Sequence, residues 1–433
     1  MLCENINVNE KGHLTFGSVD TVVLTQEYGT PLYLMDEDRI RHNCRVYLKA
    51  LAESFPEGAM PLYASKAACF KRMYEIMAEE GMGIDLVSSG EVFTAVKAGF
   101  PMERAFFHGN NKTDFDIRFA MDSKVGYFVV DGFYELQAVQ EEAAKRGITQ
   151  KIMLRLTPGI DPHTYEAVAT GKVDSKFGVA IETGQAEDFV KAAMACGNVQ
   201  VCGYHCHVGS QVFDRDGDVY HDAAAIMVGF MAKMHHAYGL DARMFNIGGG
   251  YGVRYVESDP YVDIPANIEK LAVYIKELAQ KLQIPMPHIL MEPGRSIVAD
   301  AGMTLYTVGT VKKIPGYKNY ASIDGGMTDN PRFALYGSAY TVHLANRMDE
   351  EANFTCDLVG RCCESGDIIQ PGISIPEPNR GDVVAVCTTG AYNYSMASNY
   401  NRVPRPAVVM VSGGKSYVAV KRESFEDLTA NDL

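Results

Sequence analysis

The sequence predicts a (β/α)8 TIM barrel of the α/β class, joined to a second, β-rich domain. Eight short apolar runs rich in β-branched residues each end in a polar or glycine signature, and a stretch with helical periodicity follows each run. After about residue 301 the pattern changes to short strands separated by turns. The 433 residues also exceed what one hydrophobic core usually fills, so two domains are expected.

The eight runs are expected to be buried parallel strands, because most of them are apolar throughout and do not alternate. Apolar residues at helical spacing follow them, for example over 70–77 and 268–275. In such a barrel the carboxyl ends of all strands meet at one mouth, where active sites form. The runs are PLYASKA (61–67), GIDLVS (83–88), AFFHG (105–109), YFVVDG (127–132), KIMLRL (151–156), VQVCGYHCHVGS (199–210), MFNIGGG (244–250) and HILMEPGR (288–295).

The second domain is expected to be a β-sandwich or small β-barrel. HLTFGSVDTVVL (13–24) has strand character and should join this domain, and a helix over 36–51 should lead into the TIM barrel. The predicted boundaries are therefore 36–300 for the TIM barrel, and 1–35 with 301–433 for the β-rich domain. Its C-terminal strands are expected within 303–314, 320–326, 381–392 and 407–422.

Composition argues against several classes of protein. The sequence has no uninterrupted apolar window of about 18 residues and no basic segment followed by an apolar core at its start, so we expect a soluble, cytoplasmic protein. Its ten cysteines are scattered, which fits a reducing compartment. The net charge of −14 argues against nucleic acid or an anionic membrane as a partner.

Reactive residues follow the predicted strands. Lys66 should face the barrel mouth, where desolvation would lower its pKa for Schiff-base chemistry, although most lysines are solvated surface residues. Gly248–Gly250 ends the seventh strand, where barrels often bind phosphate, although a plain turn would also explain it. Arg295 adds a permanently charged donor. Glu292 is either a salt-bridge partner of Arg295 or a carboxylate for a protonated pyridine nitrogen.

His205 and His207 flank Cys206, so in a strand both side chains would point to one face and could bind a metal ion. A metal barrel would normally supply further ligands, but the other strand ends carry mostly Lys, Gly, Asn and Ser. We therefore expect no metal, and expect one of these histidines to lie flat on a cofactor ring. A lysine, a glycine cradle, an acid and a stacking histidine at one mouth predict a pyridoxal phosphate site.

An ordered set of motifs extends from about residue 30 almost to the C-terminus. The chain thereby resembles the diaminopimelate decarboxylase family, within the alanine-racemase-like, fold-type III class of pyridoxal phosphate enzymes that includes ornithine and arginine decarboxylases. The motifs are YASKA (63–67), DLVSSGE (85–91), FHGNNKT (107–113), TPGIDPHT (157–164) with ATGKVDSKFG after it, HCHVGSQ, NIGGGYG, EPGR, DGGMTDNPRFALY (324–336), CESGD (363–367) and GAYNYSMASNYN (390–401).

This resemblance implies roles for individual residues. Lys66 is similar to the Schiff-base lysine, His207 to the ring-stacking group and Glu292 to the carboxylate that keeps the pyridine nitrogen protonated. Cys363 is similar to the proton donor, supplied by the partner subunit of a homodimer with shared active sites, with Cys362 as the alternative. The phosphate-binding set would be Ser210, Gly249, Gly250, Gly294, Arg295 and Tyr392, and the substrate contacts would be Arg295, Arg332, Tyr336, Glu364 and Tyr392.

The implied reaction is decarboxylation of meso-2,6-diaminopimelate to L-lysine and CO₂, the last step of lysine biosynthesis. A selective site should offer a cation to the distal carboxylate and an anion to the distal ammonium, which Arg332 or Arg295 with Glu364 would supply. Three alternatives stay open. They are a related decarboxylase acting on a basic amino acid or carboxynorspermidine, a non-catalytic relative, and a metal-dependent barrel hydrolase using His205 and His207.

Overall fold

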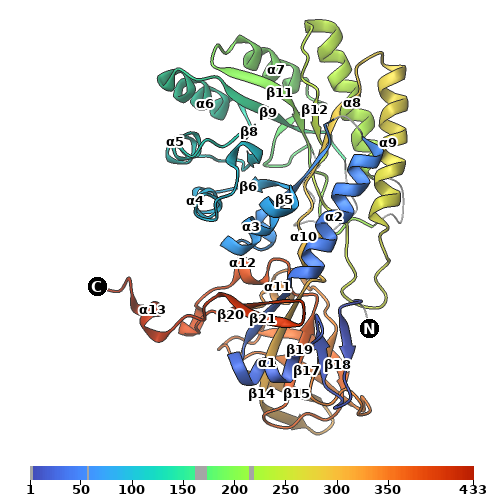
Figure 1. Cartoon of the computed structure of the whole chain (residues 1–433), viewed down its shortest axis with the longest axis vertical. Helices are drawn as coiled ribbons and strands as arrows, with labels where there is room; N and C mark the ends of the chain where they lie inside the picture. The colour runs from blue at the N-terminus through green and yellow to red at the C-terminus, as the bar shows by residue number, and fades with distance from the viewer. Residues whose placement is uncertain (1–2, 56–57, 161–172, 214–218) are drawn as a thin grey trace. The chain divides into compact units, whose positions relative to one another are not determined.

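The structure is a computed structural model that describes residues 3–55, 58–160, 173–213 and 219–433 (Figure 1). The chain forms two compact units. The barrel unit comprises 44–252 and 262–294, and the sheet unit comprises 1–43, 253–261 and 295–433. The predicted boundary at 36 lies at the end of a strand of the sheet unit, and the segment 253–261 belongs to that unit as well.

Eight parallel strands form the barrel, which confirms the predicted fold class. Each of the eight predicted runs overlaps one strand, and the β8–β9 pairing closes the ring. A further short strand, β10 (Val179–Ala180), pairs with β9 outside this ring. The barrel strands are β5 (Met60–Ala64), β6 (Gly83–Leu86), β7 (Ala105–Phe107), β8 (Tyr127–Val130), β9 (Gln150–Thr157), β11 (Val199–His205), β12 (Met244–Asn246) and β13 (His288–Met291).

Most strands end before their polar signatures, which places the reactive side chains at the barrel mouth. β12 ends at Asn246, and Gly248 then adopts a φ of +78°, which a strand does not allow. β13 ends at Met291, two residues before Pro293, which has no N–H for a strand ladder. Inside the barrel, apolar side chains fill the space below the mouth. They are Leu62, Phe106, Val129, Met153 and Leu290.

Helices follow the barrel strands, and Figure 1 shows them around the barrel. The helices expected over 70–77 and 268–275 are confirmed as α3 and α9, and the one expected over 36–51 is α2 (Glu37–Ser54). The barrel helices are α3 (Lys71–Glu80), α4 (Ser89–Lys97), α5 (Asp114–Asp122), α6 (Phe133–Arg146), α7 (Gln185–Ala195), α8 (Val219–Tyr238) and α9 (Ile264–Lys281). Within the described part of the chain, no helix is both long and apolar enough to cross a membrane.

The sheet unit contains a nine-stranded sheet to which both ends of the chain contribute, as expected. β4 (Leu32–Asp36) pairs antiparallel with β14 (Gly302–Ile314) and parallel with β20 (Ala407–Ser412). Leu32, Leu34 and Leu305 lie in its buried core. The other strands are β15 (Lys318–Ile323), β16 (Val342–Leu344), β17 (Phe354–Val359), β18 (Ile368–Ile375), β19 (Val383–Cys387) and β21 (Lys415–Val420).

The strand expectation for 13–24 is wrong at its second half. β2 (Leu14–Phe16) and β3 (Val19–Asp20) pair with each other in a separate three-stranded sheet with β1 (Ile6–Val8), and α1 (Thr21–Tyr28) follows. The reason is local: the Asp20 carboxylate accepts hydrogen bonds from the N–H groups of Val22 and Val23 and so caps a helix. This capping overrides the β propensity of the valines.

Candidate active site

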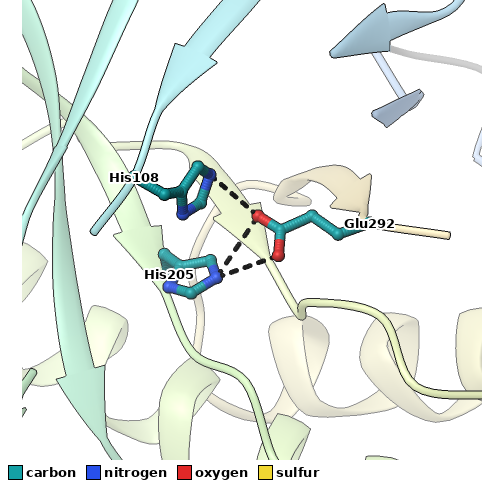
Figure 2. Close-up of side chains that lie close together, drawn as sticks. All are labelled: His108, His205 and Glu292. Atoms are coloured by element: carbon teal, nitrogen blue, oxygen red, sulfur yellow. Dashed lines mark hydrogen bonds and ion pairs between the residues drawn. The ribbon is translucent and has the colours of Figure 1, made fainter. Parts of the chain in front are cut away.

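The Glu292 carboxylate, which follows β13, meets side chains from three other strand ends of the barrel, and Figure 2 shows two of them, His108 and His205, beside it. His108 follows β7, and its Nε2 lies 3.0 Å from Glu292 Oε1. His205 ends β11, and its Nε2 lies 3.3 Å from Oε2. Asn246 ends β12 and donates its Nδ2–H to Oε1 at 2.6 Å. All four side chains are buried, so protein groups take the place of water around the carboxylate.

These donors decide the charge of Glu292. Burial alone would raise the pKa of its carboxyl group, but the electrostatic interaction and hydrogen bonds with His108 and His205 hold this pKa well below its usual value. Burial in turn lowers the pKa of His205 to about 4. At neutral pH His205 is therefore a neutral N–H donor, and Glu292 is the anion.

Lys66 lies in a short 3₁₀ turn, Ser65–Ala67, directly after β5. Its charge acts on two other groups at the mouth: together with burial it lowers the pKa of His207, and it opposes the rise in the pKa of Asp85 that burial causes. The predicted lysine, stacking histidine and pyridine acid thus belong to one electrostatic cluster.

The glycine loop after β12 meets the loop after β11. His207 Nδ1 accepts a hydrogen bond from the N–H of Gly249 at 3.3 Å, so in this structure the Gly249 amide is bonded to the imidazole. Val212 N–H donates to Gly250 O at 2.8 Å, and this contact ties the loop that contains Ser210 to the glycines. Gly294 follows β13, and a Cβ there would lie 2.9 Å from the Ala64 side chain.

In the sheet unit, two arginines and three tyrosines form a cation–π cluster. Arg295, in α10 (Arg295–Val298), donates to the Tyr255 hydroxyl at 2.6 Å, and its guanidinium carbon lies 4.8 Å from the Tyr392 ring centroid. Arg332, in α11 (Arg332–Tyr336), lies 5.0 Å from the same ring and 4.5 Å from that of Tyr336. The structure therefore brings together Arg295, Arg332, Tyr336 and Tyr392, all of which the sequence predicted.

Tyr392 precedes α12 (Asn393–Met396) with a φ of +70°. A residue other than glycine pays about 1–3 kcal/mol for such a conformation, which is found preferentially at functional sites.

Cys363 and Glu364 lie on another loop of the sheet unit. The Cys363 N–H donates to Asn401 Oδ1 at 2.8 Å, and Glu364 accepts a hydrogen bond from Tyr400 at 2.7 Å. Cys363 is exposed, whereas Cys362 is buried and its pKa is raised to about 11 by burial and by Asp367. Of the two neighbouring thiols, Cys363 is thus the accessible one.

Four residues that contact or surround these groups were not predicted as site residues: His108, Asn246, Asp85 and Tyr255. Three of them lie at or just beside the carboxyl ends of β strands, inside motifs that the sequence had already singled out. Tyr255 carries no such signal, because the segment 253–261 was assigned to the barrel. The motif TPGIDPHT, with the ATGK that follows it, falls largely on residues 161–172, outside the described residues.

The metal alternative has a different geometry from the expected one. The sequence paired His205 with His207, but the ligand atoms that lie within 4.8 Å of one another are those of His108, His205 and Glu292. One oxygen of this carboxylate also accepts a hydrogen bond from Asn246.

Comparison with known proteins identifies the family. The family described as "Pyridoxal-dependent decarboxylase, pyridoxal binding domain" matches residues 37–299. A diaminopimelate decarboxylase of Bacillus subtilis is 43% identical over 98% of this chain and 96% of the relative. The chain belongs to the diaminopimelate decarboxylase family. The relative from Staphylococcus aureus is 40% identical over 99% of both chains.

Solved structures agree with this membership. The diaminopimelate decarboxylase of M. jannaschii in complex with L-lysine is similar with a TM-score of 0.91 and 30% identity, over 100% of this chain and 99% of that one. The Helicobacter pylori enzyme complexed with L-lysine gives 0.86 and 32%, over 95% and 98%. A lysine/ornithine decarboxylase of Vibrio vulnificus gives 0.75 and 25%, over 90% and 97%.

Proposed function

We propose that this enzyme decarboxylates meso-diaminopimelate to L-lysine and CO₂, using pyridoxal phosphate held at the barrel mouth. One observation carries the proposal: Glu292 is a buried anion that accepts hydrogen bonds from His205 and Asn246 and lies 3.0 Å from His108 Nε2, in the same cluster as Lys66 and His207. A buried carboxylate of this kind stabilises a pyridinium N–H. The substrate follows from the family, since relatives at 40–43% identity are diaminopimelate decarboxylases.

The glycine loop supports a phosphate-bearing cofactor. A Cβ on Gly249 would lie 1.9 Å from the carbonyl oxygen of Glu292, and one on Gly250 would lie 2.2 Å from that of Gly209. Only glycine allows these backbones to approach so closely, and such a loop exposes amides and small surfaces to an anion. We assign Ser210, Gly249, Gly250, Gly294, Arg295 and Tyr392 to the phosphate, and Gly249 also shapes the loop.

Each of these residues has its own role in the reaction. When bound, pyridoxal phosphate accepts the electron pair that remains on the substrate carbon after CO₂ leaves. Lys66 supplies the amine that anchors the cofactor, His207 provides a flat neutral ring to lie against it, and Glu292 holds a proton at the pyridine nitrogen. The substrate side chains must orient the departing carboxylate perpendicular to the ring plane, because only that bond overlaps with the ring electrons.

The cation–π cluster supports a dicarboxylic substrate. Two guanidinium groups lie within 5.0 Å of the Tyr392 ring, so two positive charges are concentrated in one buried place. We propose that Arg295 and Arg332, with Tyr336, bind carboxylates of the substrate and that Glu364 binds its distal ammonium. Lysine and ornithine lack the distal carboxylate, so they should be poor substrates.

We further propose a homodimer with shared active sites, in which Cys363 donates the proton to the substrate carbon bound by the partner subunit. The exposure of Cys363 and the anchoring of its backbone by Asn401 support this role. Cys363→Ser should abolish turnover while Cys362→Ser keeps it. The reverse result would assign the role to Cys362, and full activity in a demonstrated monomer would refute the shared site.

A cytoplasmic location is also proposed, since the ten cysteines, all within the described residues, form no disulfide, which suits a reducing compartment. The deciding assay supplies pure protein with pyridoxal phosphate and measures CO₂ and L-lysine from meso-diaminopimelate. L-lysine, L-ornithine, L-arginine and carboxynorspermidine serve as competing substrates. Turnover of one of these instead would move the specificity, whereas a flat visible absorption spectrum would indicate a non-catalytic relative. Loss of activity on chelation would revive the metal alternative.

A further inference from the structure

A second buried carboxylate, Asp85, lies close to Glu292, and one imidazole lies between them. His108 Nε2 is 3.0 Å from Glu292 Oε1 and 3.8 Å from Asp85 Oδ1. Both carboxylates are less than one-tenth exposed. Two negative charges so close together in a desolvated site repel each other, so one carboxylate should hold a proton more readily than the other.

The two carboxylates are supplied with donors very unequally. Glu292 lies within hydrogen-bonding distance of His108, His205 and Asn246. Asp85 Oδ1 has no hydrogen-bond partner among the described residues. His108 Nε2 is in ion-pair contact with Glu292 Oε1 without forming a hydrogen bond, so the hydrogen bonds to Glu292 come from His205 and Asn246. Burial raises the pKa of Asp85; His108 opposes this rise, and Glu292 adds to it. The pKa of Glu292 moves in the opposite direction.

We propose that His108 and His205 are positioning residues that direct the negative charge of this carboxylate pair to Glu292, and thereby keep the ring nitrogen of the cofactor protonated. This inference rests on the proposed pyridoxal phosphate function and deepens it. Neither histidine is required to touch the cofactor, since both act through Glu292 (Figure 2).

The tautomer of His205 fits this role. Its Nδ1 is buried and has no hydrogen-bond partner among the described residues, while Nε2 faces a carboxylate that can only accept. The proton therefore resides on Nε2. Asn246 is oriented in the same way, because its Oδ1 accepts the N–H of Gly248 at 2.9 Å and its amide N–H₂ is left to face Glu292.

Other charged groups at the mouth do not supply this selection. Lys66 and Arg155 oppose the rise in the pKa of Asp85 that burial causes, so they favour a negative charge on Asp85 rather than on Glu292. Arg155 itself lies 3.7 Å from Asp131 and 4.3 Å from the Phe177 ring centroid. The donors after β7 and at the ends of β11 and β12 therefore favour Glu292 as the carboxylate that carries the negative charge.

The test uses two substitutions at each histidine. Leucine removes the N–H donor at similar volume, whereas glutamine offers a neutral N–H at a similar position. In His108→Leu and His205→Leu we expect kcat to fall on the order of tenfold, with KM little changed. The nitrogen NMR signal of isotopically labelled cofactor should move toward the unprotonated position. Glutamine should restore both.

Asp85→Asn and Glu292→Gln test which of the two carboxylates keeps the ring nitrogen protonated. Removing the competing carboxylate should leave the ring nitrogen protonated, whereas Glu292→Gln should lose that proton. His343→Leu, in β16 of the sheet unit, controls for loss of a largely buried histidine and should move neither kcat nor the nitrogen signal. A fall in kcat without movement of the nitrogen signal in the leucine variants would overturn the proposal. So would equal effects of Asp85→Asn and Glu292→Gln, or a stoichiometric metal ion that His205→Leu releases.

Measurements on the apoprotein separate this inference from the proposed function. The imidazole N–H signals of His108 and His205 should shift in Glu292→Gln and stay in place in His343→Leu. This readout requires no cofactor. If the wild-type chain bound no pyridoxal phosphate, the proposed function would fail while these signals still tested the contact; unshifted signals would refute the positioning role.

Discussion

Replacing His205 by glutamine should make the protein less sensitive to acid. Burial lowers the pKa of His205 from 6.5 in the unfolded chain to about 4. Between these values the unfolded state binds a proton at this residue that the folded state does not, so stability rises with pH and is lost as the pH falls toward 4. Glutamine cannot take up that proton, yet it keeps an N–H donor for Glu292.

The magnitude follows from proton linkage. With these two pKa values, lowering the pH from 8 to 5 costs the wild-type protein about 2 kcal/mol through His205 alone, and roughly 3 kcal/mol below pH 4. Burial also lowers the pKa of His207, but that residue is common to both proteins. Only the difference between wild type and variant therefore measures His205.

Urea unfolding of the two apoproteins at both pH values, at one protein concentration, gives this difference. At pH 8 His205 is neutral in the folded and the unfolded chain, so the comparison there reports the cost of the substitution itself. At pH 5 the wild type should have lost about 2 kcal/mol more than His205→Gln. Equal losses in the two proteins would refute a buried neutral imidazole at this position.

Three further predictions concern other parts of the molecule. Gly249→Ala should weaken cofactor binding at least about tenfold, because the added Cβ meets backbone atoms; Gly229→Ala in α8, where nothing lies within 4 Å, is the control for equilibrium dialysis. Lys112→Met should cost about 3–5 kcal/mol in urea unfolding, since Nζ donates to two carbonyls and, at 2.8 Å, to buried Glu135, which would be left uncompensated. Arg332→Ala should lower kcat/KM about 30-fold through KM with an unaltered cofactor spectrum, and the opposite pattern would contradict its substrate role.

The barrel could be predicted from sequence because its signal is repeated eight times. Each run is mostly apolar, and some end in residues that cannot continue a strand, as at Gly248 and Pro293. The prediction missed the strands β16, β17 and β18, and it was wrong at 21–24, where a single side chain decides the backbone. Asp20 turns a valine-rich strand pattern into a helix by capping two N–H groups, and hydrophobic periodicity does not record this.

The site was predicted in part, for a physical reason. Lys66, His207 and Glu292 can be recognised from their residue types and from their positions in the motifs. His108 and Asn246 also lie in motifs, but their residue types do not indicate a role, because a histidine or asparagine after a strand has many uses. Their role depends on which strands are neighbours and on how far each side chain reaches into the mouth. Both facts come only from the closed ring.

It follows that the charge of Glu292 is not a property of the motif that contains it. The same EPGR sequence, placed in a barrel without donors on β7, β11 and β12, would contain a buried carboxyl group whose pKa burial raises, which favours its neutral form. A neutral acid cannot stabilise a pyridinium ion. Residues nearly two hundred positions away, such as His108, therefore decide whether Glu292 can perform the function that its motif suggests.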